Sequence, residues 1–260
     1  MNLAYKNISY SKVGTGPHLC FLHGFCEDSS IWDGLIESLA HDYTCIAIDL
    51  PGFGNSSKLQ FTSIPEVAHQ VNELLINEKA ENCILFGHSM GGYIAAAYLE
   101  KYADSLVGVA FVHSTVVNDP PAKKENRQKT IDFINQHGTQ EFFRLFVPGL
   151  VAIQNRSKLR EQLTNLVSST PNKSIVNGLQ AMMKRPSSLE SVAQFSKPIL
   201  FIKGQEDTHY KELEIYRQAS LCSLVQLSVL QNVGHLSMLE DKKKCLTEVK
   251  HFLNFVEIYK

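Results

Sequence analysis

Short apolar runs alternate along this chain with stretches of helical periodicity, and this alternation constrains the fold more than any other sequence feature. Strands that alternate with helices are typical of a parallel sheet with crossover helices. No helical stretch separates the first two predicted strands, so we expect an antiparallel edge there. The predicted strands are residues 3–12, His18–Leu22, Tyr43–Ile48, Cys83–Phe86, Leu106–Val112, Ile199–Lys203 and Val225–Leu230, and the predicted helices lie near residues 31–40, 64–79, 90–103, 209–220 and 241–257.

The alternation stops between Val116 and about Glu190. This segment opens with the polar stretch NDPPAKKENRQK and continues with the pattern of several short helices, without a clear strand. We therefore predict one α/β core domain, formed by residues 1–115 and 191–260, with a helical insertion of residues 116–190 between two strands of its sheet.

Composition and charge exclude several classes of protein. The 25 Lys+Arg residues against 26 Asp+Glu residues give a net charge of −1, which leaves no excess of cations to neutralise nucleic-acid phosphates. No apolar run approaches the roughly 20 residues of a membrane helix. The opening MNLAYKNISYSKVG lacks the apolar stretch of a secretory signal. We predict a cytoplasmic protein with no membrane span and no nucleic-acid partner.

The six cysteines form no CxxC pair, and several lie inside apolar runs such as HLCFL and NCILF. We expect buried thiols that pack as small hydrophobic side chains. The ten histidines pair with no cysteine or carboxylate at the spacing of zinc ligands, so we predict no metal site.

The stretch NCILFGHSMGGY, residues 82–93, carries the strongest chemical signal. An apolar strand runs into the motif GHSMG around Ser89, and a helical pattern follows, which is the context of a G-x-S-x-G nucleophile elbow. Glycines are needed because side chains two positions either side of Ser89 would collide in the strained turn that presents its hydroxyl. Ser89 is the predicted nucleophile, and the alternative is a glycine-rich turn without a chemical role.

An acid and a base follow two later strands. Asp207 lies in the stretch GQED after PILFIK, and His235 lies in NVGH after LVQLSVL. Because open α/β sheets gather their sites at the carboxyl ends of strands, we predict that the fold brings both residues to Ser89. His235 would act as general base, and Asp207 would fix its tautomer. Glu206 and Asp119 are the alternative acids.

A tetrahedral acyl intermediate needs two donors aimed at its oxyanion. We expect one from the backbone N–H of Met90, directly after the nucleophile, and the other from the backbone N–H of Phe25 in the stretch CFLHGF. His23, in the same stretch, is expected to brace this loop rather than to transfer a proton.

Together, the stretches HGF, DLPGFGNSS, GHSMGG, GQED and VGH resemble those of the α/β-hydrolase superfamily, in particular its capped members with a serine nucleophile. The resemblance covers residues 18–115 and 196–258, and the chain order Ser…Asp…His is that of the family. It implies an eight-stranded, mostly parallel sheet with helices on both faces, a helical cap inserted after the sixth strand, and a site without a cofactor. It also places Phe25 after the third strand and DLPGFGNSS after the fourth, where we expect a structural turn.

The nucleophile favours acyl chemistry, because the haloalkane dehalogenases and epoxide hydrolases of this superfamily carry aspartate where this chain has Ser89. We therefore predict a carboxylesterase-like serine hydrolase that cleaves a small carboxylic ester or related acyl compound through an acyl-enzyme, as a monomer or homodimer. Lactonases, thioesterases and perhydrolases of the family share the same triad. Two alternatives stay open: a C–C bond hydrolase or lyase that uses the same Ser–His pair on a carboxylated substrate, and a binding module without activity.

Charge gives one indication of the substrate. Residues 116–190 hold 11 Lys+Arg and 6 Asp+Glu, a net charge of +5, whereas the rest of the chain holds 14 and 20, a net charge of −6. We hypothesise that Arg127, Arg144 or Arg185 reaches the site and holds an acid group of the substrate. Alternatively, these charges face solvent on the helices of the insertion.

Aromatic residues of the insertion are the candidates for an acyl pocket. Phe142, Phe143 and Phe146 are expected to line it. Alternatively, Phe142 and Phe146 pack the insertion onto the sheet, because they lie at i and i+4 on one helix face. Trp32 is expected to be a packing residue near the site.

Overall fold

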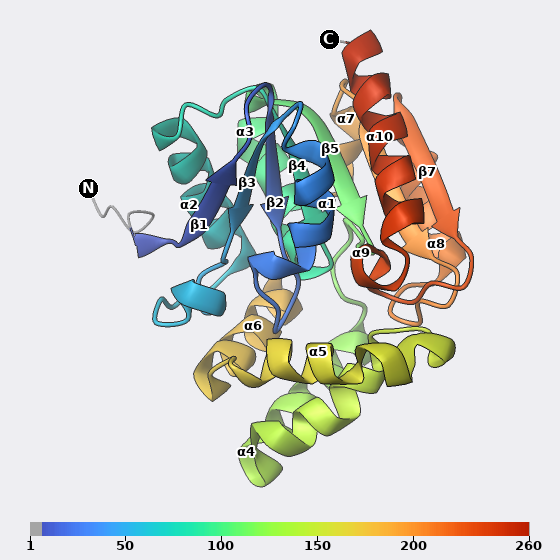
Figure 1. Cartoon of the computed structure of the whole chain (residues 1–260). Coiled ribbons are helices and arrows are strands. Elements are labelled where there is room, and N and C mark those ends of the chain that lie inside the picture. The colour runs from blue at the N-terminus through green and yellow to red at the C-terminus, as the bar shows by residue number, and fades with distance from the viewer. Residues whose placement is uncertain (1–6, 260) are drawn as a thin grey trace.

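A mixed sheet runs through the centre of the molecule, with helices on both of its faces (Figure 1). The computed structural model describes residues 7–259. Within that range the sheet has seven strands in the order β1-β3-β2-β4-β5-β6-β7. Strand β1 pairs with β3 in the antiparallel sense, and all other neighbouring pairs are parallel. The strands are β1 (Tyr10–Val13), β2 (His18–Leu22), β3 (Thr44–Ile48), β4 (Cys83–His88), β5 (Leu106–Val112), β6 (Ile199–Gly204) and β7 (Val225–Leu230).

Most of the strand predictions are confirmed, and one expectation about the sheet is wrong. Strands β2, β5 and β7 have the predicted bounds, and the antiparallel edge is present. An eighth strand is not found among residues 7–259. The predicted first strand, 3–12, begins outside the described residues. Within them, the backbone N–H of Ser9 donates to the Ser56 hydroxyl (2.8 Å) instead of to a neighbouring strand.

Three segments follow a different strand than expected, and in each case the strand's number along the chain is lower by one. The insertion follows the fifth strand, β5, rather than the sixth. Phe25 follows β2 rather than a third strand, and the DLPGFGNSS loop follows β3 rather than a fourth.

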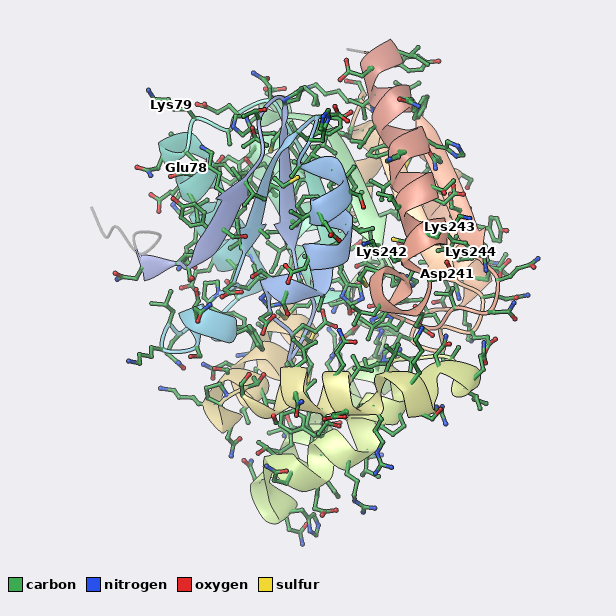
Figure 2. All side chains as sticks on the ribbon, viewed as in Figure 1. Glu78, Lys79, Asp241, Lys242, Lys243 and Lys244 are labelled. Carbon is green, nitrogen blue, oxygen red and sulfur yellow. The ribbon has the colours of Figure 1, made fainter. Side chains whose placement is uncertain are left out.

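The inner strands are buried on both faces, whereas β1 is an exposed edge. A parallel strand that helices cover on both sides needs a continuous apolar run, as in TCIAI of β3. All residues of β1 are exposed, and Glu78 at the end of α2 (Ile64–Asn77) holds this strand in place. Its carboxylate accepts the Tyr10 hydroxyl (2.6 Å) and lies 3.2 Å from Nζ of Lys12. Figure 2 labels Glu78 where the chain leaves α2.

Helices flank the sheet on both faces, and two of them begin at a side chain that caps the first turn. Helices α1 (Asp33–Leu39) and α10 (Lys242–Ile258) cover one face, and α2, α3 (Met90–Tyr102) and α8 (Glu212–Ala219) cover the other (Figure 1). The Ser63 hydroxyl accepts the backbone N–H of Glu66 (3.2 Å) and so caps α2. Asp241 caps α10 by accepting the N–H of Lys244 (3.0 Å). The short helix α9 (Ser237–Glu240) precedes α10, and 3-10 turns occur at Ser29–Trp32, Gly54–Ser56 and Ala103–Ser105.

The segment between β5 and β6 is helical, as predicted. Its helices are α4 (Pro121–Phe146), α5 (Arg156–Ser168), α6 (Asn172–Lys184) and α7 (Leu189–Gln194), with 3-10 turns at Val147–Gly149 and Ile153–Asn155. Helix α4 is interrupted at Gly138, which has φ 82°. Helices α4, α5 and α6 lie beyond the carboxyl ends of the parallel strands, and α7 returns to pack on α3 (Figure 1).

The core contains the residues that the apolar runs predicted. Trp32 is fully buried and packs on Phe21 with ring centroids 5.3 Å apart, so it is a packing residue. Five of the six cysteines are buried, and Cys222 is half-buried. None of the helices described for residues 7–259 has both the length and the apolar character that a bilayer span requires.

Candidate active site

Ser89 lies at a sharp turn between β4 and α3, with φ 48° and ψ −110°. A non-glycine residue at positive φ is strained, and strain of this kind is concentrated at functional sites. The flanking glycines are required by space. A Cβ on Gly87 would lie 2.4 Å from the carbonyl oxygen of Gly91, and a Cβ on Gly91 would lie 2.3 Å from that of Leu22. The turn therefore has the strand–turn–helix geometry that the motif predicted.

Gly91→Ala is expected to destabilise the fold, because the new Cβ would meet backbone atoms of β2 that cannot move without disturbing the sheet. Overpacking of this kind typically costs about 1–3 kcal/mol of unfolding free energy. Urea unfolding should show this loss relative to the control Gly149→Ala, whose Cβ would meet no atom within 4 Å. Equal stability of the two variants would contradict the steric explanation.

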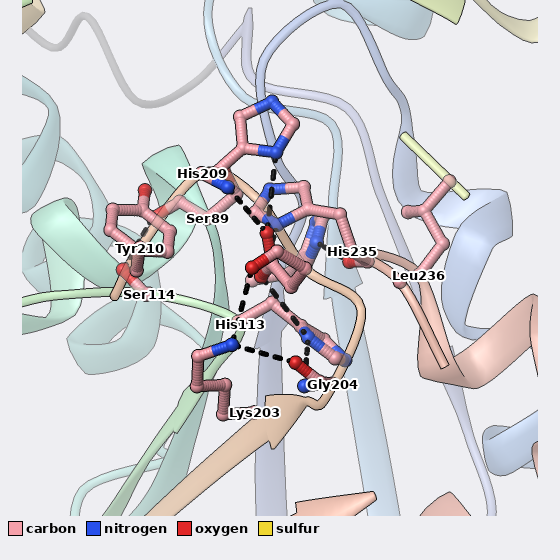
Figure 3. A network of polar contacts seen from close by, with 12 residues as sticks. Ser89, His113, Ser114, Lys203, Gly204, His209, Tyr210, His235 and Leu236 are labelled. Atoms are coloured by element: carbon pink, nitrogen blue, oxygen red, sulfur yellow. Dashed lines mark hydrogen bonds and ion pairs between the residues drawn. The ribbon is translucent and has the colours of Figure 1, made fainter. Parts of the chain in front are cut away.

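His235 follows β7 and Asp207 follows β6, and both side chains are buried. Figure 3 shows the polar contacts around His235. Nδ1 of His235 lies 2.8 Å from Oδ2 of Asp207. Asp207 also accepts the backbone N–H of His209 (2.9 Å), and the His209 ring stacks on His235 with centroids 4.2 Å apart. The structure thus brings together the predicted acid and base.

The electrostatic surroundings set the charge of this pair. Burial opposes the negative charge of Asp207, but the electrostatic effect of His235 and the polar contacts with His113, His209 and His235 outweigh it and lower the pKa of Asp207 well below its usual range. Burial lowers the pKa of His235 well below its usual range, since the opposing effect of Asp207 is smaller. The resting pair is an anionic carboxylate bonded to a neutral imidazole, the state that a general base requires.

Two buried residues that the sequence analysis did not single out support the Asp207 loop (Figure 3). Nζ of Lys203 donates to the carbonyl oxygens of Gly204 (2.7 Å) and Asp207 (3.2 Å). Nδ1 of His113 lies 3.6 Å from the Asp207 carboxylate. A signal for both was present, because each polar residue comes at the end of an otherwise apolar strand.

A second histidine, His88, connects the Phe25 loop to the base. Its Nδ1 lies 2.9 Å from the Glu27 carboxylate, and its Nε2 lies 2.9 Å from the carbonyl oxygen of His235. Glu27 also accepts the backbone N–H of Gly24 (2.7 Å). Burial opposes the charged form of His88, but Glu27 outweighs this effect and raises the pKa of His88. This buried bridge holds the two loops in register.

Glu240 connects the His235 loop to the segment that follows α4. Its carboxylate accepts the backbone N–H of Gly234 (2.9 Å) through one oxygen and that of Ala152 (2.7 Å) through the other. The backbone N–H of His235 itself donates to the carbonyl oxygen of Leu150 (2.9 Å). The backbone of His235 is therefore fixed partly by the helical insertion and not only by the sheet.

His113, Asp207 and His235 are also the one group in residues 7–259 whose ligand-type atoms lie close enough, within 4.8 Å, to share a metal ion. Three such ligands are the minimum of a catalytic zinc site. Their atoms are engaged, however. Asp207 and His235 bond each other, and the N–H groups of Gly204 and Ser237 lie 3.1 and 3.2 Å from the two ring nitrogens of His113. These contacts fit a hydrogen-bonded acid–base pair better than a metal centre.

The predicted oxyanion donors occupy the expected local positions. Phe25 follows β2, and Met90 is the first residue of α3, where the helix dipole favours negative charge. Within the described part of the chain, neither of these two backbone N–H groups is used in a hydrogen bond. Both are therefore free to serve a ligand, and their role as oxyanion donors stays a prediction.

His23 and the DLPGFGNSS loop brace each other. Nδ1 of His23 lies 2.8 Å from the carbonyl oxygen of Gly24, and the backbone N–H of Leu50 donates to its Nε2 (2.9 Å). Burial lowers the pKa of His23. The Asp49 carboxylate accepts the backbone N–H of Asn55 (2.9 Å) and closes the loop on itself. Both features are structural, as expected.

Ser89 and His235 both line one cavity of about 80 Å³. No hydrogen bond in residues 7–259 links the Ser89 hydroxyl to His235. Such bonds are often loose in structures without substrate. The other lining residues are Phe25, Glu27, Tyr93, Lys123, Arg127, Phe146, Leu150, Met182, His209 and Tyr210.

The structure brings only some of the predicted substrate contacts to this cavity. Phe146 and Arg127 line it. Phe142 stacks on Phe146 from behind, with ring centroids 5.0 Å apart. Phe143 and Arg144 line a separate cavity of about 680 Å³ between α4 and α5, which contains no residue of the predicted triad. Residues two positions apart on a helix do not share a face, so the exposed Arg144 does not line the same cavity as Phe146.

Arg185 does not line the cavity, but it contacts Tyr93, which does. Its buried guanidinium lies over the ring of Tyr93, with Cζ 3.7 Å from the ring centroid. The same group pairs with Asp119 at 2.9 Å. Arg185 is therefore a support behind the cavity wall and not a lining residue.

Neither alternative acid contacts His235 within the described residues. Asp119 is buried in an ion pair with Arg127 (2.6 Å). Glu206 is exposed and accepts a hydrogen bond from the side chain of Gln154 (3.0 Å). The contacts of Asp207 make it the only one of the three carboxylates with a hydrogen bond to the His235 ring in this range.

Tyr93, Lys123 and Tyr210 line the cavity and were missed by the sequence analysis. Local signals existed for two of them. Tyr93 comes one helical turn after Ser89 on α3, and Lys123 comes one turn before Arg127 on α4, so each shares a helix face with a residue that we did consider. Tyr210 had no such signal, because its position depends on the path of the loop after β6.

Comparison with known proteins identifies the family. The family model described as alpha/beta hydrolase fold matches residues 17–242. The chain belongs to the α/β-hydrolase family, which confirms the resemblance seen in the sequence.

Two relatives and one solved structure are similar to this chain over most of its length. The chain is 26% identical over 215 residues to a pimeloyl-[acyl-carrier protein] methyl ester esterase of Vibrio vulnificus (strain YJ016), covering 77% of this chain and 80% of the relative. It is 26% identical over 248 residues to the biotin biosynthesis bifunctional protein BioHC of Cellvibrio japonicus (strain Ueda107), covering 92% of this chain but 48%, about half, of that relative. A malate-bound thermophilic esterase from Thermogutta terrifontis has a similar structure, with a TM-score of 0.88, 26% identity and coverage of 96% and 93%.

Proposed function

We propose that this protein is a serine hydrolase that cleaves a small carboxylic ester through an acyl-enzyme intermediate. The observation that carries the proposal is the strained Ser89 turn, which opens on the same cavity as a His235 ring bonded to Asp207. A serine hydroxyl becomes nucleophilic when an adjacent base accepts its proton and a third group orients that base. The esterase names of two of the proteins described above agree with this reaction class.

In the proposed course, Nε2 of His235 takes the proton of the Ser89 hydroxyl while Oγ attacks the ester carbonyl carbon. The negative charge moves to the carbonyl oxygen, where the N–H groups of Phe25 and Met90 would stabilise it. Collapse of this intermediate breaks the ester C–O bond, and the imidazolium returns the proton to the leaving alcohol. Water, activated by the neutral His235, then releases the acid and regenerates Ser89.

We propose residues 116–190 as a cap over this site, with the core formed by residues 1–115 and 191–260. Support comes from the cavity itself, since Lys123, Arg127 and Phe146 of α4 form part of its wall. The name of the Vibrio relative favours a methyl ester as the leaving group. The cavity is much smaller than the roughly 300–1,000 Å³ of typical ligand pockets, which favours a short acyl part.

The direct test is hydrolysis of a panel of p-nitrophenyl and methyl esters, with mass spectrometry of the protein after a rapid acid quench. We expect turnover and an acyl adduct on the peptide that contains Ser89. Turnover without any adduct at Ser89 under burst conditions would argue against the acyl route.

A C–C bond hydrolase or lyase is the second candidate, because the cations in the cavity wall suit a carboxylated substrate. In that reaction the Ser89–His235 pair would serve mainly in proton transfer, and no ester bond would be required. Product analysis separates the candidates, since only the ester route releases an alcohol.

The activity is expected to persist to unusually low pH. His235 accepts a proton only when neutral, and its lowered pKa keeps it neutral as the pH falls below 6.5, while Asp207 stays anionic because its pKa is lowered too. The acid limb of kcat/KM, measured between about pH 4 and pH 8, should therefore lie below pH 6.5. Circular dichroism at each pH controls for unfolding. An acid limb centred at pH 6.5 or above in folded protein would contradict the prediction.

A further inference from the structure

One wall of the cavity that Ser89 lines carries more positive than negative charge. Lys123 and Arg127 of α4 line this wall, and Arg185 lies directly behind it. Asp119 is the carboxylate among them, and it is occupied by both arginines, at 2.6 Å from Arg127 and 2.9 Å from Arg185. The cluster therefore contains three cations and one anion.

Lys123 has no carboxylate within ion-pair distance in residues 7–259. Its Nζ lies 3.4 Å from the carbonyl oxygen of His209 and 4.4 Å from the ring centroid of Tyr210. Glu27, the one acidic residue among those that line the cavity, is held by the N–H of Gly24 and the ring of His88. No acid of the cavity wall therefore neutralises the Lys123 charge.

Two buried tyrosines add hydrogen-bonding capacity to the same wall. The hydroxyls of Tyr93 and Tyr210 lie 2.5 Å apart, and both residues line the cavity. Two hydroxyls carry two protons, and only one of these lies between the oxygens, so the second is available to a ligand. Burial raises the pKa of Tyr93, but Lys123, Arg185 and Arg127 outweigh it and lower that pKa. The wall thus stabilises negative charge at the position of these oxygens.

A partly buried excess of positive charge is costly unless an anion compensates it. Charge-assisted hydrogen bonds from Lys, Arg and tyrosine hydroxyls to a carboxylate are among the stronger polar contacts in proteins. An anionic group of the substrate would compensate the charge of Lys123 and accept the spare hydroxyl proton, beside Arg127 and its partner Asp119. An uncharged substrate would leave Lys123 without an anionic partner.

We infer that Lys123, Arg127, Tyr93 and Tyr210 form a subsite for a carboxylate of the substrate, so that the preferred substrates are esters that also carry a free carboxylate, such as half-esters of short dicarboxylic acids. This inference rests on the proposed ester hydrolysis at Ser89. It places the reacting ester near His235 and the free carboxylate at α4. Residues Lys123 and Arg127 then determine specificity without taking part in proton transfer.

The test compares monomethyl with dimethyl esters of succinate, glutarate and adipate, which differ only in the free carboxylate. Lys123→Gln and Arg127→Gln are each expected to lower kcat/KM for the best half-ester by about 10- to 100-fold. The corresponding dimethyl ester should change by less than about threefold, because it makes no charged contact at this wall. The matched controls are Lys124→Gln, the exposed neighbour on α4, and Arg144→Gln, which lies outside the cavity.

A second measurement is independent of turnover. Glutarate binding to Ser89→Ala, followed by calorimetry, should weaken by a similar factor when Lys123→Gln is added, and should not change with Lys124→Gln. If half-esters and dimethyl esters lose activity equally for every diacid, the subsite is refuted while ester hydrolysis stands. If neither ester type is hydrolysed, the proposed function fails, and the glutarate titration alone decides on the subsite: binding that depends on Lys123 supports it, and its absence refutes it.

Discussion

Ser89→Ala is expected to lower kcat for ester hydrolysis by about 10⁶-fold, the scale found when the nucleophile of a serine triad is removed. No other described hydroxyl on the cavity wall can replace it as nucleophile, since the two tyrosine hydroxyls bond each other. Binding is expected to survive, because the free amides and the cavity wall do not depend on the Ser89 hydroxyl. The loss should therefore appear in kcat rather than in KM.

A fluorophosphonate probe gives an independent readout of the same residue. Wild-type protein should be labelled once, at Ser89, and Ser89→Ala should not be labelled. Ser220→Ala, at an exposed serine beyond the end of α8, is the control and should keep both labelling and turnover. Persistent labelling or turnover in Ser89→Ala would remove this residue from the mechanism.

Asp207→Asn is expected to lower kcat by about 10⁴-fold, as the equivalent change does in other serine triads. The amide has nearly the same shape as the carboxylate. However, it can donate to Nδ1 of His235 and favour the wrong tautomer, and it does not stabilise the imidazolium that forms during acylation. The effect should therefore be large on kcat and small on the thermal midpoint.

Glu206→Gln is the matched control, because Glu206 is the adjacent carboxylate and its contact is to Gln154. It should keep near wild-type kcat. Asp119→Asn tests the other alternative acid with a neutral ester as substrate. Wild-type activity in Asp207→Asn together with a large loss in Asp119→Asn would transfer the role of the acid to Asp119.

The sequence could predict that Asp207 and His235 meet, and that Ser89 lines the same cavity as His235, because strand ends are well defined. Ser89 directly follows a strand, and Asp207 and His235 lie in the loops after two later strands; in a parallel sheet such positions converge on one edge. The steric demand on Gly87 and Gly91 could likewise be deduced from the motif alone. Local patterns determined these features, so one sequence was enough.

The helical insertion was harder to interpret for a physical reason. Helical periodicity shows which residues share a face, but not which partner covers that face. Phe142, Phe143 and Arg144 were therefore assigned to the pocket together with Phe146, although only Phe146 reaches it. Lys123 was overlooked among the exposed charges of the same segment. The prediction of an eighth strand was wrong. It came from the resemblance to the family, whereas the backbone N–H of Ser9 bonds the Ser56 hydroxyl and not a further strand.

The double contact of Glu240 ties one side of the insertion to the His235 loop. Because one carboxylate holds both Gly234 and Ala152, lifting the Leu150 side of the insertion would displace the backbone of the base. That side behaves as an anchor. Any motion of the insertion that leaves the His235 backbone in place must therefore leave the segment from Leu150 to Ala152 in place as well.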